Sequence, residues 1–303
     1  MDKIGLVTVT YNSAKVLQSF LDCVWKQTYN NLVLFVIDNA SDDETDSILK
    51  ISKDNRLNII KNESNLGVAK ANNQGISFAM SMGCDQVLLI NNDVEFEINL
   101  IEKLLKVQVQ QSCSLVVPKM MYFDNNDCLW YAGSWFRKLN GYLPLHRGIG
   151  ERDEGQFDKI TKVDYAPTCC LLVKKQVFLD IGLMDEKYFV YFDDTDFSFR
   201  VWRDSRHKLF YCPDVKFYHK VGSLTASFSN SAEKKYRGGF FIKYNIRNHV
   251  YFLKKIGTVF CYIFIIWLFF KNNLKFIFNS DIRKNFTTWK LINISYLEGL
   301  LLK

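Results

Sequence analysis

Short apolar runs alternate with stretches of helically spaced apolar residues over the first ninety positions of the chain. Four runs have the length of buried strands, and they are residues 4–10, 32–37, 57–60 and 87–90. A helix is expected between each run and the next, because apolar residues there recur three and four positions apart. This alternation predicts an α/β fold in which a mostly parallel sheet has helices on both faces.

The expected helices of this part have recognisable starting signals. Ser13 is expected to cap the first helix, and Ser41 with Glu44 three residues later forms the pattern of a capping box for the second. The third helix is expected over residues 68–82. Local signals therefore account for each crossover between the expected strands.

The remainder of the chain is less regular. Residues 120–165 mix aromatic, glycine and charged residues without periodicity, so loops and added strands are expected there. A buried run follows at 169–173, then a helix at 175–181, and a further helix is expected to begin at the acidic segment 193–196. We expect one folded unit over residues 1–250, with halves at 1–95 and 96–250, and a distinct region at 251–303.

The region 251–303 differs from the rest in charge and hydropathy. It holds eight Lys or Arg against two acidic residues, and so carries most of the formal net charge of +7. Within it, residues 256–270 contain no charged side chain. Spanning a bilayer takes roughly 20 residues, so this run is short for a membrane span. An interfacial helix on an anionic membrane surface, a buried helix and a span remain the alternatives.

Composition also constrains partners and compartment. The first 250 residues are nearly neutral, which argues against a nucleic-acid groove. The eight cysteines include no C-x-x-C pair and no Cys/His cluster, so reduced structural thiols are expected. The first strand begins a few residues after Met1, which leaves no room for a signal peptide and predicts a cytoplasmic location.

Polar residues follow each strand-like run, where an α/β sheet collects its ligands. The chain contains neither G-x-G-x-x-G nor G-x-x-x-x-G-K-[ST], so a dinucleotide fingerprint and a P-loop are excluded. Any nucleotide site must use another arrangement. The polar clusters are Thr10 to Asn12, Asp38 to Ser41, Asn65 to Gly67 and Asn91 to Asp93.

The chain also carries a series of motifs. They are V-T-V-T-Y-N at 7–12, D-N-A-S-D-D at 38–43, N-L-G-V-A-K-A-N-N at 65–73, I-N-N-D-V at 90–94, Y-F-V-Y-F-D-D-T-D-F-S-F-R at 188–200, His219 and Tyr244-x-x-Arg247-Asn248. In this order they resemble the family 2 glycosyltransferases of the GT-A fold, especially the rhamnosyltransferase-like branch. The resemblance covers about residues 4–255, and it makes residues 1–95 the nucleotide-binding half and 96–250 the acceptor and catalytic half.

The resemblance implies a site for a nucleotide-sugar donor. The carboxylate of Asp38 can accept hydrogen bonds from a uracil or thymine ring or from a ribose, and Gly67 allows close backbone approach. Helix capping is the alternative role for Asp38 and Ser41. The donor-binding residues implied are Thr10, Tyr11, Asn12, Asp38, Asn39, Ser41, Asn65, Gly67, Asn72 and Asn92.

A divalent cation is implied as well. The family's metal motif is Asp-x-Asp, and here Asn91 replaces the first acid while Asp93 keeps the second. Asp93 would hold Mn²⁺ or Mg²⁺ against the diphosphate, and His219 resembles the family's nitrogen ligand. A solvated turn and a structural histidine are the alternatives for these two residues.

The acidic segment is implied to supply the catalytic base. Inversion at an anomeric carbon needs a carboxylate that takes the proton of the acceptor hydroxyl. Asp194 aligns with the second acid of the family's Glu-Asp pair, and Asp193 replaces the Glu, so either residue can face the acceptor. Asp196 and Arg200 are spaced for an ion pair within a helix.

Other positions bear on the sugar. Where relatives commonly have Gly-Ala, this chain has Thr168 and Cys169, preceded by Pro167. This difference should change the shape of the pocket, so the sequence does not predict which sugar is transferred. Trp130, Tyr131 and Trp135 are candidates for stacking on a sugar face or for the core.

We expect an inverting, metal-dependent glycosyltransferase that moves a sugar from a UDP- or dTDP-linked donor to a glycan or lipid-linked acceptor in surface polysaccharide synthesis. It would lie peripherally on the inner face of the cell membrane. The alternatives are a membrane-attached module that binds nucleotide sugars or glycans without catalysis, and a nucleotidyltransferase. A nucleotidyltransferase would show a basic glycine-rich loop after the first strand, which Thr10 to Ser13 lack. A module that binds without catalysis has no need of a base, so the retained Asp93, Asp194 and His219 argue against it.

Overall fold

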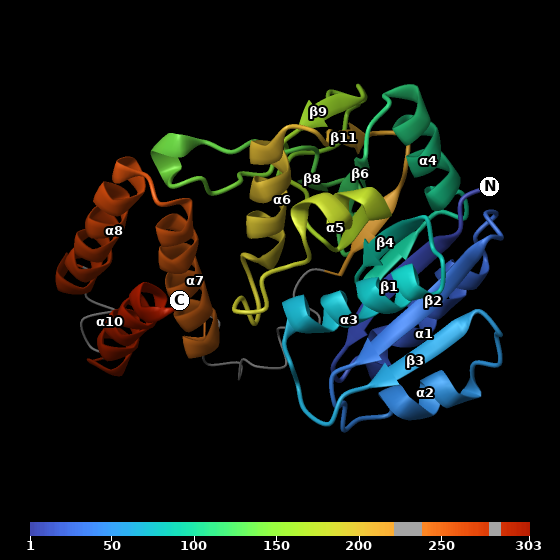
Figure 1. The fold of residues 1–303 in the computed structure, drawn as a ribbon, viewed down its shortest axis with the longest axis horizontal. Coiled ribbons are helices and arrows are strands. Elements are labelled where there is room, and N and C mark those ends of the chain that lie inside the picture. The colour runs from blue at the N-terminus through green and yellow to red at the C-terminus, as the bar shows by residue number, and fades with distance from the viewer. Residues whose placement is uncertain (221–237, 279–285) are drawn as a thin grey trace.

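The structure is a computed structural model, and it describes residues 1–220, 238–278 and 286–303. Its main sheet has eight strands in the order β3-β2-β1-β4-β10-β6-β11-β9 (Figure 1). In that order the strands are Leu57–Lys61, Leu32–Asp38, Ile4–Thr10, Gln86–Ile90, Cys170–Lys174, Leu115–Pro118, Leu209–Cys212 and Thr161–Val163. The chain thus builds one half of the sheet from its first ninety residues and the other half from later segments.

The two halves of the sheet differ in strand direction. β3, β2, β1 and β4 are all parallel, whereas β10 is antiparallel to both β4 and β6. β11 is parallel to β6, and β9 is antiparallel to β11. The expected parallel half is confirmed, and the carboxyl ends of its strands meet at one edge of the sheet.

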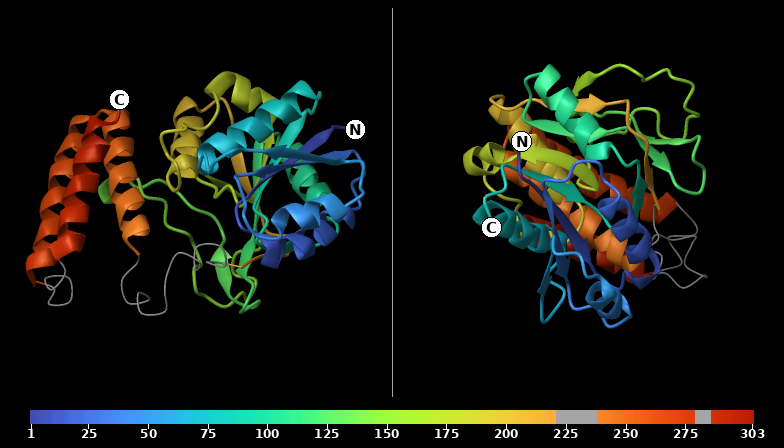
Figure 2. Two further views of the ribbon diagram at one scale, coloured as in Figure 1. Left: turned by 90° about the horizontal axis from the view of Figure 1, so that it is seen from below. Right: turned by 90° about the vertical axis from the view of Figure 1, so that its right-hand side faces the viewer.

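Helices cover both faces of the sheet. In the left view of Figure 2, α3 lies on one side of the sheet and α1 and α2 lie on the other. Gly75 of α3 lies directly against Val7 of β1, because a Cβ there would overlap the valine side chain. The helices up to residue 204 are α1 Ala14–Trp25, α2 Thr45–Ile51, α3 Val68–Ser81, α4 Leu100–Gln110, α5 Lys175–Ile181 and α6 Asp193–Asp204.

A smaller sheet stands beside the end of β4. Its strand order is β5-β12-β7-β8, formed by Val94–Phe96, Phe217–His219, Met120–Tyr122 and Leu129–Tyr131. β5 follows β4 after the three residues Asn91 to Asp93, and β12 pairs with β5 so that His219 lies opposite Val94. This pairing brings two segments that are far apart in sequence to the edge where the parallel strands end.

The described residues of the C-terminal region form a bundle of the helices α7, α8 and α10. α7 Gly239–Ile256 packs against both α8 Val259–Phe278 and α10 Phe286–Leu301. The bundle stands to one side of the sheet and meets it through α7 and α6, as the contact of Phe252 with Phe199 shows (Figure 1). None of the helices in the described ranges is both long and apolar enough to cross a bilayer.

The structure confirms some local expectations and corrects others. The helices at 68–82, at 175–181 and from Asp193 are present to within a residue. Ser13 precedes α1 but its side chain makes no capping bond. The capping box is wrong, because α2 begins at Thr45 and the Ser41 hydroxyl donates to Asp38 instead. The uncharged run 256–270 is not one helix, since Gly257 ends α7 in a left-handed conformation.

Candidate functional site

A carboxylate held by two hydroxyls lies at the carboxyl ends of β1 and β2. Asp38 is only 4% exposed, and its Oδ1 accepts hydrogen bonds from Thr10 Oγ1 at 2.9 Å and from Ser41 Oγ at 2.5 Å. The backbone N–H of Asn12 donates to Ser41 Oγ at 2.9 Å. The hydroxyls fix the orientation of the carboxylate, so its remaining acceptor capacity is directed in advance of any ligand.

The loop after β3 joins this cluster. Asn39 Nδ2 donates to the carbonyl of Gly67 at 3.2 Å, and the N–H of Gly67 donates to Asn65 Oδ1 at 2.9 Å. Gly67 has φ of 84°, and a Cβ there would overlap Phe189. The close approach that this glycine permits is therefore to the segment that precedes α6.

Three further predicted donor residues have different surroundings. Asn92 is buried, its Nδ2 donates to the carbonyl of Val9 at 2.7 Å, and its Oδ1 has no hydrogen-bond partner among the described residues. Asn72 is buried on α3, and Tyr11 is half-buried beside Ser13. Asn92 is thus tied to β1 while keeping a free acceptor at the same sheet edge.

Asp93 and His219 lie together where the small sheet meets the main one. His219 Nε2 is 3.5 Å from Asp93 Oδ1, and the backbone N–H of Lys220 donates to the carbonyl of Asp93 at 2.9 Å. The ring of His219 packs edge-on against Trp130, and its Nδ1 has no hydrogen-bond partner in the described part of the chain. The pairing of β12 with β5 creates this contact between residues 126 positions apart.

The carboxylate oxygen of Asp93 and the ring nitrogen of His219 could bind a divalent cation only together with further ligands. Adjacent ligands of an octahedral ion lie about 3 Å apart, close to the observed separation of Asp93 and His219. No group of three or more His, Cys, Asp or Glu that could hold an ion occurs within residues 1–220, 238–278 and 286–303. Oxygen atoms of a bound diphosphate would have to complete the coordination shell.

Asp193 and Asp194 begin α6 in unequal environments. Asp193 is fully buried, and burial together with the charge of Asp194 raises its pKa well above the ordinary value. Asp194 is half-buried; burial raises its pKa too, while hydrogen bonds to it act in the opposite direction. Asp194 is therefore the more exposed of the two residues.

A tyrosine that the sequence analysis did not single out holds Asp194. Tyr165 Oη donates to Asp194 Oδ2 at 2.7 Å, and Tyr131 Oη donates to the carbonyl of Tyr165 at 2.6 Å. Tyr131 is fully buried, so it serves the core and the stacking role considered for it is wrong. The contact could not be read from the sequence, because Tyr165 and Asp194 are 29 positions apart.

The thiol of Cys169 is influenced by the charges of both Asp93 and Asp194. Burial raises the pKa of Cys169 well above its ordinary value, and the nearby charges of Asp93 and Asp194 act in the same direction. Both acids are thus within electrostatic range of the same side chain, which immediately precedes β10. All eight cysteines are free, as expected.

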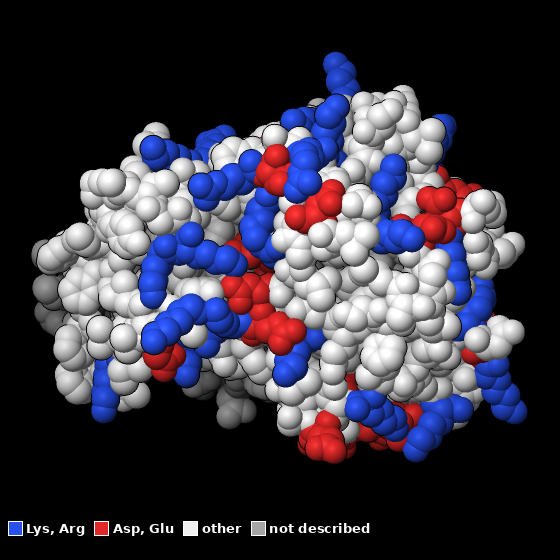
Figure 3. Space-filling view, in the orientation of Figure 1, with Lys and Arg blue, Asp and Glu red and all other residues white. Residues whose placement is uncertain are grey.

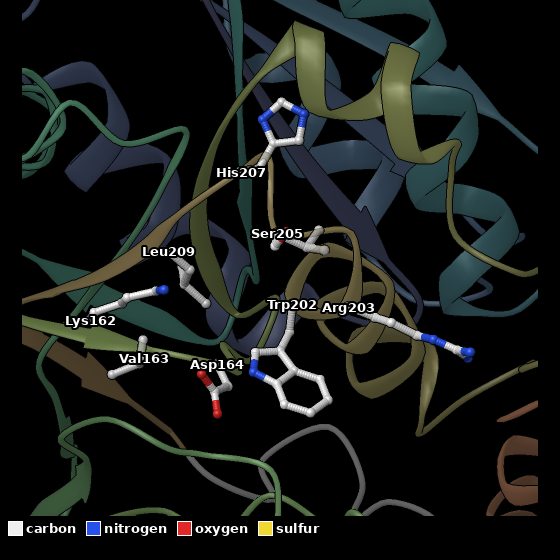
Figure 4. Close-up of a pocket in the computed structure, with 9 residues that line it drawn as sticks. Lys162, Val163, Asp164, Trp202, Arg203, Ser205, His207 and Leu209 are labelled. Atoms are coloured by element: carbon white, nitrogen blue, oxygen red, sulfur yellow. The ribbon is translucent and has the colours of Figure 1, made fainter. Parts of the chain in front are cut away.

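A cavity elsewhere on the surface lies away from this edge. It has a volume of about 400 Å³ and is lined by Lys162, Val163, Asp164, Val201, Trp202, Arg203, Ser205, His207 and Leu209. Figure 4 shows Trp202 and Asp164 side by side, with Arg203 directed away from them. Trp202 and Arg203 belong to the last turn of α6, whereas Asp193 and Asp194 begin this helix. The cavity is therefore not the site formed by the predicted residues.

Comparison with known proteins gives a family and a set of relatives. The family model for glycosyl transferase family 2 matches residues 6–182. The dTDP-rhamnosyl transferase RfbF of Shigella flexneri is 27% identical over 229 residues, 72% of this chain and 69% of that protein. The low-salt glycan biosynthesis hexosyltransferase Agl10 of Haloferax volcanii is 22% identical over 209 residues. This chain spans 63% of the length of Agl10.

Solved structures agree in fold. The crystal structure of S. aureus TarS 1–349 superposes with a TM-score of 0.61 at 14% identity, covering 99% of this chain and 81% of that one. The same protein in complex with UDP-GlcNAc gives 0.60 at 15% identity, with 98% and 81% covered. GalNAc-T7 with UDP, GalNAc and Mn²⁺ gives 0.57 at 15% identity, with 72% and 44% covered. These likenesses confirm the expected fold.

Proposed function

Because this chain belongs to glycosyl transferase family 2, we propose that it transfers a sugar from a nucleotide diphosphate donor to an acceptor hydroxyl, with inversion at the anomeric carbon. The donor is a UDP- or dTDP-sugar, and the acceptor is a glycan or a lipid-linked glycan in surface polysaccharide synthesis. The names of relatives support this, since they include a dTDP-rhamnosyl transferase and a hexosyltransferase of glycan biosynthesis. The observation that carries it is the half-buried carboxylate of Asp194, held by Tyr165.

The donor occupies the edge where β1, β2 and β4 end. The Asp38 carboxylate, oriented by Thr10 and Ser41, accepts hydrogen bonds from the base or ribose. Asn12, Asn39, Asn65, Gly67, Asn72 and Asn92 frame the same pocket together with Tyr11. A buried carboxylate with prearranged neighbours binds without reorganising, which is how a polar site gains selectivity for a nucleoside.

Asp93 and His219 would hold Mn²⁺ or Mg²⁺ beside the diphosphate. Such an ion neutralises the charge that develops on the leaving nucleoside diphosphate. The separation of 3.5 Å between His219 Nε2 and Asp93 Oδ1 supports this pairing, as does the His219 Nδ1 that lacks a protein partner in the described residues. The hydrophobic contact of His219 with Trp130 keeps the ring oriented towards Asp93.

Asp194 acts as the general base. The oxygen of the acceptor hydroxyl forms a bond to the anomeric carbon, the bond from that carbon to the diphosphate oxygen breaks, and the hydroxyl proton passes to Asp194. Nucleoside diphosphate leaves with the bonding electron pair. Asp193, beside it on α6, is the second choice for this role, because it is the more deeply buried of the two residues.

The test begins with a screen of UDP- and dTDP-sugars for hydrolysis by the full chain with Mn²⁺ and with Mg²⁺. Asp194→Asn should then lower the transfer rate by about 10²-fold or more while the affinity for the donor nucleotide stays within a few-fold. The matched control Asp193→Asn should cost less. If Asp193→Asn is the more damaging change, the role of general base belongs to Asp193. Near-normal rates in both variants would refute this chemistry.

The same proposal places the protein on the cytoplasmic face of a cell membrane, through its C-terminal bundle. Both α8 and α10 expose large apolar side chains, and these include Ile263, Ile266, Phe270, Phe286, Leu297 and Leu301. On the face drawn in Figure 3, Lys and Arg gather where the bundle meets the rest of the molecule, and the left-hand side of the bundle is largely uncharged. An apolar face with cations beside it suits the interface of an anionic bilayer.

A further inference from the structure

The segment before the catalytic carboxylates has an unusual backbone. We call residues 184–192 the pre-α6 segment; it ends immediately before Asp193, the first residue of α6. Its last two residues, Tyr191 and Phe192, both lie in the left-handed region, with φ of 62° and 69°. Two consecutive non-glycine residues rarely adopt this conformation, so the surrounding structure must impose it.

Helix α7 supplies the hydrogen bonds that do so. Asn248 is fully buried, and its Nδ2 donates to the carbonyls of Val190 at 2.7 Å and Tyr191 at 2.9 Å. Its Oδ1 accepts from Arg247 Nε at 2.8 Å, and Arg247 Nη2 donates to the carbonyl of Lys187 at 2.6 Å. One asparagine thus uses both of its amide hydrogens on the turn that aims Asp193 and Asp194.

A second group of contacts joins α7 to the same region by charge. Lys255 Nζ lies 2.8 Å from both Asp185 Oδ2, in the pre-α6 segment, and Asp196 Oδ1, in α6. Tyr251 Oη also donates to Asp185 Oδ2, at 2.9 Å. The start of the segment and the first turn of α6 are therefore fixed to one face of α7.

The nucleotide-binding half holds the other side of the segment. Asn73 of α3 exchanges two hydrogen bonds with the backbone of Met184, at 2.9 and 3.0 Å. The N–H of Val68 donates to the carbonyl of Phe189 at 2.7 Å. Because α3 begins directly after the donor loop, this side of the segment is tied to the donor site, whereas the α7 side holds the carbonyls of Val190 and Tyr191 next to the carboxylates.

We propose that Asn248 is a positioning residue for the carboxylates of Asp193 and Asp194, so that the C-terminal bundle completes the catalytic site through α7. The proposal rests on the function assigned above to Asp194. A purely structural asparagine would affect stability alone, whereas a positioning residue affects turnover separately from donor binding.

The test compares Asn248→Ala with Asn245→Ala. Asn245 lies one turn earlier on α7, and its Nδ2 donates only within the helix, to the carbonyl of Phe241 at 3.0 Å. Asn248→Ala should lower kcat by about 10- to 100-fold. Its affinity for UDP or dTDP, whichever the wild-type chain binds, should stay within about threefold, because Asn248 does not contact the donor pocket. Amide hydrogen exchange in residues 185–196 should speed up in this variant. Asn245→Ala should leave all three measurements unchanged.

The outcomes separate the two proposals. An active wild-type chain with unaltered kcat and exchange in Asn248→Ala overturns the positioning role alone. A wild-type chain that turns over no nucleotide sugar overturns the proposed function and, with it, the catalytic role of Asn248. If Asn248→Ala does not fold, Tyr251→Phe carries the test, because it removes one hydrogen bond to Asp185 and keeps the ring. A reduced kcat with retained nucleotide affinity supports the proposal, and an unchanged kcat refutes it.

Discussion

Asp194 differs from Asp193 chiefly in having a tyrosine hydroxyl as a partner. The hydrogen bond from Tyr165 favours the ionised form of Asp194, and it opposes the burial that raises the pKa of this carboxyl. Ionisable groups nearby include Asp193 on the same helix and the Cys169 thiol immediately before β10. A base must be ionised to accept a proton, so in the role proposed for Asp194 the hydrogen bond from Tyr165 would widen the pH range in which this carboxylate is ionised.

Tyr165→Phe tests this balance. Removing the hydroxyl should raise the pKa of Asp194, so the acidic limb of the pH profile of kcat should move to higher pH by roughly half a unit to one unit. The rate at high pH should change less. Tyr211→Phe is a matched control, since Tyr211 is fully buried and its hydroxyl has no hydrogen-bond partner in the described residues. An acidic limb that stays in place in Tyr165→Phe would remove Tyr165 from this role.

Asp93 and His219 carry the prediction about the ion. Asp93→Asn removes the charge that would hold the cation, so UDP or dTDP binding supported by Mn²⁺ should fall by at least about tenfold, as measured by calorimetry. His219→Ala should weaken it as well. His207→Ala is the control, because His207 bonds to Ser114 and Asp180 and not to Asp93. Mn²⁺-dependent affinity equal to wild type in Asp93→Asn would refute the assignment.

At the scale of single elements, α8 and α10 lead to a prediction about membranes. Ile263 and Ile266 of α8 are 60% and 58% exposed. The full chain should bind vesicles that contain phosphatidylserine, and binding should weaken with salt as the attraction of Lys and Arg is screened. Replacing both isoleucines by Ser should reduce the salt-resistant part of the binding. Ile51→Ser on α2, which is 75% exposed, should not. A chain that ignores such vesicles at low salt contradicts the proposal.

The elements also show what sequence patterns can and cannot predict. Each βα unit up to residue 90 was predictable because its strand and helix carry their own periodicity. The strands of the small sheet were not, since β5, β7, β8 and β12 have only three residues each and depend on partners far along the chain. The capping box failed for a related reason. The hydroxyl of Ser41 donates to Asp38 instead of capping a helix, and the capping-box pattern does not take this competing hydrogen bond into account.

At the scale of the whole molecule, the candidate site gathers residues from Thr10 to His219, which are far apart in the sequence. Asp38, Asp93, Asp194 and His219 were identified from motifs, and the structure places Asp93 against His219 and beside the same thiol as Asp194. Their supporting residues were not identified in these roles. Tyr165 and Asn73 act through contacts 29 and 111 positions away, and no local pattern marks such pairs.

The pre-α6 segment has a consequence for how this protein can be recombined. In Figure 2 the helical bundle stands apart like an attachment that could be exchanged between relatives. The hydrogen bonds of Asn248 and the ion pairs of Lys255 contradict that appearance. A chimera that takes residues 239–303 from another member of the family would inherit a mismatched turn ahead of Asp193. A working chimera should therefore take two separate segments from the same relative, namely the bundle and residues 184–196.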